Sequence, residues 1–181
     1  MKMDLQPGGW LDRLASKEAA RDRLRPSDRT GQMIGAVISL LFAVYFFALY
    51  DSNSGFFLSN FSMLDAVLFF GIAFFGVAPS LMRAITGRKN SSRPLDIIVS
   101  FFILVAAVWF SSSFPFDFSH LPDSLPESSR FLMSWVSDGL ARLFLLLAIV
   151  VSVFIIPYTT LLYIIVRQKL SQSPQILERE T

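Results

Sequence analysis

Long apolar runs alternate with short polar connections along this chain, and this pattern is its strongest signal. A hydrocarbon core about 30 Å thick is crossed by about 20 apolar residues in a helix. Four runs have this character, at about residues 33–50, 62–82, 95–112 and 140–166. The pattern therefore predicts an all-α membrane protein with four transmembrane helices arranged as antiparallel hairpins.

The same pattern divides the chain into three parts. These are a polar N-terminal segment (1–31), the transmembrane domain (32–168) and a polar tail (169–181). Within the first part, residues 10–25 lack Gly and Pro, and Trp10 and Leu14 fall on one helical strip. This favours a short helix lying on the membrane surface, ended by Pro26. The alternative is a solvated tail whose Ala and Arg residues merely favour helix.

A second amphipathic stretch precedes the last span. In residues 127–138, the apolar residues Phe131, Leu132 and Trp135 recur at helical spacing with polar residues between them. We expect an amphipathic helix here on the outer surface, ending near Gly139.

Basic residues are distributed very unevenly between the connections. Seven precede the first span, four lie between the second and third, and three follow the fourth. Only Arg130 and Arg142 remain for the other side. The positive-inside rule then places both termini in the cytoplasm. Because the first thirty residues contain no apolar core of signal-peptide length, we expect the first span to act as the insertion signal.

Composition narrows the function classes. Hydrophobic residues make up 53% of the 181 residues and charged residues 17%, which leaves little chain for a separate soluble catalytic domain. The basic residues flank apolar runs, so anionic lipid on the cytoplasmic face is a better partner than nucleic acid. The candidate lipid or partner contacts are Arg21, Arg23, Arg25, Arg88, Lys89 and Arg93.

Small residues suggest where helices pack. Gly35, Ser39 and Ala43 recur every four residues in the first span, and Gly71 and Gly76 lie in the second. Such positions let a neighbouring helix approach closely. Two further residues, Pro79 and Pro157, mark sites where the second and fourth spans can bend.

Few ionisable residues fall near the spans. Asp65 and Asp96 each begin a span, where an acid complements the helix dipole. Ser62-x-x-Asp65 resembles a capping box, and Ser92 and Pro94 look like a helix start beside Asp96. Asp138 and Arg142 are four residues apart and can form an outer ion pair, or Arg142 can pair with Asp65. The absence of acids, lysine or histidine from the span interiors disfavours a stand-alone transporter.

The only histidine, His120, lies in the outer loop between Asp117 and Asp123. One histidine with two acids makes a poor metal site, and adjacent Ser119, His120 and Asp123 lack the rigid frame of a catalytic triad. With no cysteine and no nucleotide- or haem-binding motif, we expect no cofactor and no resident metal.

Three functions remain open. The favoured hypothesis is a non-enzymatic accessory or scaffold subunit of a larger membrane complex, with other membrane proteins as partners. The alternative is a homo-oligomeric channel or small transporter. A membrane-embedded lipid-modifying enzyme is the third, and the cluster around His120 is its only support.

Overall fold

The computed structural model describes residues 8–177, with side chains described as far as residue 172, and throughout this range the regular structure is helical. Its elements are α1 (Trp10–Ala20), α2 (Pro26–Asp51), α3 (Met63–Thr86), α4 (Lys89–Ser113), three short 3₁₀ helices η1 (Phe118–His120), η2 (Pro122–Ser124) and η3 (Glu127–Leu132), and α5 (Asp138–Leu177). Helices α2 to α5 are long and apolar enough to cross a membrane, which confirms the predicted all-α class with four candidate spans.

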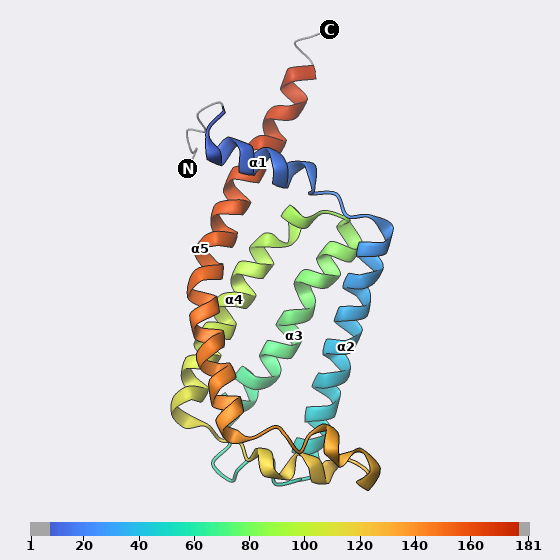
Figure 1. The fold of residues 1–181 in the computed structure, drawn as a ribbon, viewed down its shortest axis with the longest axis vertical. Coiled ribbons are helices and arrows are strands. Elements are labelled where there is room, and N and C mark those ends of the chain that lie inside the picture. The colour runs from blue at the N-terminus through green and yellow to red at the C-terminus, as the bar shows by residue number, and fades with distance from the viewer. Residues whose placement is uncertain (1–7, 178–181) are drawn as a thin grey trace.

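The four long helices stand in a row rather than in a closed ring. Each packs against the next in chain order, so α2 and α5 form the two edges (Figure 1). Helix α1 lies across α5 at one end of the row, which we call the α1 end (Figure 1). The connections 52–62 and 114–137 cover the opposite end, which we call the loop end.

The N-terminal surface helix is shorter than predicted. It ends at Ala20 instead of reaching residue 25, and Pro26 begins α2. Proline suits the first turn of a helix because that turn has no use for its missing N–H group. The first long helix therefore starts at Pro26, ahead of the predicted boundary at residue 33.

The start of α3 follows the sequence signal. Ser62 caps the helix by accepting a hydrogen bond from the Asp65 amide at 3.2 Å, and the Asp65 carboxylate accepts from the Ser62 amide at 2.7 Å. This reciprocal capping satisfies two N–H groups that the helix leaves free. The predicted capping pattern Ser62-x-x-Asp65 is thus confirmed.

The start of α4 does not follow its sequence signal. The helix begins at Lys89, so Pro94 and Asp96 lie inside it and Asp96 is not in its first turn. The reason is a cap supplied from elsewhere in the chain: buried Asp22 accepts the Asn90 amide on its carboxylate at 2.7 Å and the Lys89 amide on its carbonyl at 2.9 Å. These bonds extend the helix by a turn beyond the local pattern.

A cluster of aromatic side chains closes the loop end. Phe56, 1% exposed, packs against Phe116 at a ring distance of 5.6 Å, and Phe116 packs against Phe110 of α4 at 5.0 Å. The two loops are joined by the Asp117 amide, which donates to the Phe56 carbonyl at 2.8 Å. Aromatic burial of this kind fixes the loops on the helix ends.

The predicted amphipathic helix over 127–138 is wrong in type and in extent. The chain forms the short 3₁₀ helix η3 and then turns, and Asp138 and Gly139 already belong to α5. The Trp135 ring N–H donates to the Leu132 carbonyl at 2.7 Å, and the Leu140 amide donates to the Ser137 hydroxyl at 3.3 Å. These local bonds turn the chain into α5 in place of a continuous helix.

The small residues predicted to pack helices divide into two groups. Ala43 is buried, whereas Gly35 is exposed with no neighbour within 4 Å, and Ser39, half-buried, donates to the Gly35 carbonyl at 3.0 Å. At Gly71, α3 and α4 approach one another closely, since a Cβ there would lie 2.7 Å from the Phe102 ring of α4. Gly76 has no neighbour within 4 Å. Within the described residues, no neighbouring helix packs against Gly35 or Gly76, and packing of these two glycines against another chain stays a prediction.

These two glycines give a matched pair of variants. Gly71→Ala should lower the free energy of unfolding by about 1–2 kcal/mol, because α3 or the Phe102 ring must shift. Gly76→Ala on the same helix should be neutral or slightly stabilising, since alanine favours helix and meets nothing. Unfolding of both variants in mixed detergent measures the difference, and equal effects would contradict the assigned α3–α4 contact.

Candidate functional site: a charged pocket at the α1 end

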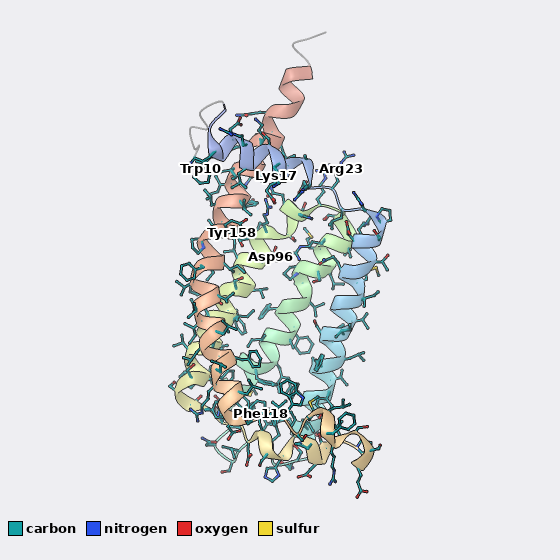
Figure 2. All side chains as sticks on the ribbon, in the orientation of Figure 1. Trp10, Lys17, Arg23, Asp96, Phe118 and Tyr158 are labelled. Atoms are coloured by element: carbon teal, nitrogen blue, oxygen red, sulfur yellow. The ribbon has the colours of Figure 1, made fainter. Side chains whose placement is uncertain are left out.

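A pocket of about 390 Å³ lies at the α1 end and is lined by residues of all four long helices. Its lining residues are Leu24, Gln32, Arg83, Lys89, Arg93, Asp96, Ser100, Ile155, Thr159 and Leu162. Figure 2 labels Asp96 among the helices near this end, and Phe118 at the loop end. The lining therefore includes residues of both edge helices, α2 and α5, and of α3 and α4 between them.

Arg83 makes hydrogen bonds to neighbouring helices on one side of the pocket. Its Nη2 donates to both carboxylate oxygens of Asp96, at 2.5 and 2.6 Å, and its Nε donates to the Ser92 hydroxyl at 2.8 Å. Its Nη1 donates to Gln32 of α2 at 3.3 Å. One guanidinium thus links three helices with charge-assisted bonds, which are stronger than neutral ones. The turn at Gly87, with a φ of +64°, brings α4 back alongside α3 so that these residues meet.

Arg93 makes hydrogen bonds to neighbouring helices on the other side of the pocket, and its residue is 8% exposed. Its Nη2 donates to Glu18 of α1 at 2.8 Å, and its Nη1 donates to the Asn90 side chain at 3.0 Å and to the Leu162 carbonyl of α5 at 3.2 Å. A buried cation needs such partners, because an unpaired charge away from water is costly. Arg93 therefore fastens α1 and α5 to α4.

Lys89 differs from both arginines. Its side chain is exposed at the rim of the pocket, at the first residue of α4. Within residues 8–177 its ammonium group has no hydrogen-bonding or ion-pair partner. Lys89 is thus an exposed cation of the pocket lining at the start of α4.

The predicted basic contacts separate into two sets. Lys89 and Arg93 line the pocket, whereas Arg21, Arg23, Arg25 and Arg88 are exposed outside it. Sequence reasoning missed Arg83 and the role of Asp96 as its partner. A signal was present in the chain, since Arg83 and Asp96 stand on either side of the glycine turn that joins two apolar runs.

The predicted outer ion pair is wrong. Asp65 accepts from the Trp109 ring N–H at 2.7 Å and Asp138 accepts from the Phe118 amide at 2.9 Å. The Arg142 guanidinium lies 4.0 Å from the centre of the Phe114 ring, a cation–π contact. No ion pair joins these three residues in the described chain, because each has a nearer partner on another element.

The loop histidine lies among acids but is open to solvent. His120 Nε2 is 3.6 Å from Asp117, and Nδ1 is 3.9 Å from Asp123. Hydrogen bonds from the Ser119 hydroxyl and amide hold the pKa of the Asp117 carboxyl below its ordinary value. Over residues 8–177 no group of three acidic, histidine or cysteine side chains is arranged to hold a metal ion.

A further ion pair joins α1 to α5 at the α1 end. Lys169 donates to the Asp12 carboxylate at 2.7 Å, and this bond, followed by one from the Gly8 amide, holds the pKa of Asp12 below its ordinary value of 3.8. A carboxyl whose pKa is lowered by folding stabilises the fold above its unfolded pKa and loses that effect as the pH falls through the folded pKa. The link therefore contributes fully at neutral pH.

This gives a prediction for pH. The distance between spin labels at Arg13→Cys and Ser171→Cys should stay constant from pH 8 to pH 5 and should widen only below about pH 4. The same titration with Asp12→Asn, which cannot ionise, should lack the transition. Widening near pH 6 would contradict the assignment to Asp12.

The fold defines an integral multi-pass membrane protein, and most basic residues of the described chain lie at the α1 end. Comparison with protein-family models, with curated proteins and with solved structures gives no match.

Proposed function

We propose that the protein is a non-enzymatic accessory or scaffold subunit of a larger membrane complex, with the α1 end in the cytoplasm. The observation that supports this best is the open row of helices, whose edge α5 is barely covered. In the most apolar 18-residue stretch of α5, 6% of the residues are buried, against 17% to 22% in the other long helices. An edge helix of this kind has room for a transmembrane helix of another subunit.

The length of α5 supports the same proposal. Its 40 residues would extend about 60 Å, roughly twice the hydrocarbon thickness, and it continues past α1 (Figure 1). A helix that spans the bilayer and then projects from it can contact a partner at both depths.

The orientation is supported by charge. Within the described chain the basic residues gather at the α1 end, and only Arg130 and Arg142 lie at the loop end.

Purification of the tagged protein from its native membranes in mild detergent, followed by mass analysis, tests the proposal. We expect at least one different membrane protein in fixed stoichiometry. Recovery of this chain alone, as a monomer or as a homo-oligomer, would contradict the proposal.

A pair of variants locates the contact. Phe154→Ala on α5 should reduce recovery of the partner severalfold, whereas Phe74→Ala on α3 should not. These side chains are 71% and 64% exposed, so both substitutions remove a ring from the surface of the chain. Equal recovery with both variants would count against α5 as the contact.

A channel formed by several copies is the second candidate, and one observation favours it. The polar lining of the pocket reaches from Lys89 to Ser100 along α4, which is about 16 Å of helix and about half of the hydrocarbon thickness. Conductance across planar bilayers containing the purified protein tests this candidate, and no current for small cations or anions would exclude it.

A further inference from the structure

The pocket at the α1 end carries donors that the described chain does not use. Arg93 Nε donates to no described residue, although Arg93 is 8% exposed and lines the pocket. The Lys89 ammonium at the rim adds three more N–H groups. Two cations of the lining, Lys89 and Arg93, therefore have N–H groups without a partner in the described chain.

The charge of the pocket favours a negatively charged ligand. Its lining contains three cations, Arg83, Lys89 and Arg93, and one anion, Asp96. Asp96 is paired with Arg83, and Glu18 of α1, which is outside the lining, is paired with Arg93. Neither carboxylate neutralises Lys89, which leaves one cation in excess. The pocket thus suits an anion with several acceptor oxygens, for which phosphate is the usual partner of Lys and Arg.

The surroundings of the pocket select a lipid over a free ion. Leu24, Ile155 and Leu162 form an apolar part of the same lining, and Ile155 is 41% exposed on the edge helix α5. The pocket lies toward the α1 ends of the four apolar helices, and the ends of membrane-spanning helices lie near the lipid headgroups. A free phosphate would use the cations but not this apolar wall.

We propose that the pocket binds one glycerophospholipid with a net negative charge, its phosphate held by Lys89 and Arg93 and its chains lying past Ile155 along α5. Arg83 supports the site by holding Asp96 away from the phosphate. This proposal is independent of the accessory role, because a lone protein with this pocket would bind the lipid equally well.

Native mass spectrometry of the detergent-purified protein, titrated with phosphatidylglycerol or phosphatidylcholine, tests the proposal. We expect one tightly bound phosphatidylglycerol, with an affinity about tenfold above that for phosphatidylcholine. Lys89→Gln should remove most of this preference, and Lys89→Arg should keep it. Lys17→Gln removes an exposed cation of α1 that does not line the pocket, and it should change the affinity less than twofold.

A second variant and a second probe complete the test. Thr159→Leu fills the pocket without changing its charge and should also abolish the preference. Inorganic phosphate at millimolar concentration should not displace the lipid. Equal affinity for the two lipids, equal effects of Lys89→Gln and Lys17→Gln, or displacement by inorganic phosphate would each overturn the proposal.

Discussion

Replacement of Arg93 by alanine should lower the free energy of unfolding in detergent by about 2 kcal/mol or more. Removing one partner of a buried ion pair costs about 3–5 kcal/mol, and the partial exposure of Glu18, 24%, reduces this value. The variant also leaves the Leu162 carbonyl and the Asn90 side chain without their donor. Denaturant unfolding followed by circular dichroism measures the loss.

Two further variants make the Arg93 prediction specific. Arg21→Ala removes a nearby cation that is exposed, and it should change the stability by no more than about 0.5 kcal/mol. Arg93→Lys keeps the charge but cannot reach three acceptors in the same way, so an intermediate loss is expected. Equal stability of Arg93→Ala and Arg21→Ala would show that Arg93 does not join α1, α4 and α5.

Replacement of Asp65 by alanine should cost about 2–3 kcal/mol. Asp65 is 3% exposed, and it both completes the capping box of α3 and accepts the Trp109 ring N–H of α4 at 2.7 Å. Loss of a capping side chain costs about 0.5–2 kcal/mol, and loss of one hydrogen bond between side chains costs about 0.5–1.5 kcal/mol. Unfolding curves of the purified variant give the value directly.

A double-mutant cycle with Trp109→Phe separates the two roles of Asp65. The Asp65–Trp109 coupling should be about 1 kcal/mol, with the rest of the loss belonging to the cap. Asp51→Ala, at an exposed acid on the last turn of α2, serves as the control and should be neutral. A coupling near zero would contradict the bond between α3 and α4.

Features of the fold that depend on neighbouring residues could be predicted from the sequence. The four spans follow from the length of the apolar runs, and the start of α3 follows from Ser62 and Asp65. Both are set by forces that act within one helix, namely transfer into hydrocarbon and satisfaction of the first N–H groups. Such forces leave a readable pattern in the local sequence.

Features that depend on distant residues could not be predicted in the same way. Asp22 caps α4 across 68 positions of sequence, and this moves the start of α4 to Lys89. Arg93 reaches Glu18 across 75 positions. The sequence contains these polar residues but does not say which of many acids and bases meet, because that is decided by how the helices pack.

The candidate site shows the same division. Lys89 and Arg93 could be selected as basic residues beside an apolar run, and the structure adds that they line a pocket. The pairing of Arg83 with Asp96 was hidden by the expectation that Asp96 begins a helix. A carboxylate one turn or more inside a helix needs a partner, and this criterion would have pointed to Arg83.

We expect the chain to cross the membrane four times, with the α1 end and the loop end on opposite faces. Because the chain has no cysteine, single substitutions Ala20→Cys, Ser119→Cys and Ser171→Cys can be labelled with a membrane-impermeant thiol reagent without background. In intact cells we expect labelling of Ser119→Cys alone, and labelling of the other two only after the membrane is opened. Labelling of Ala20→Cys and Ser171→Cys on opposite faces would contradict it.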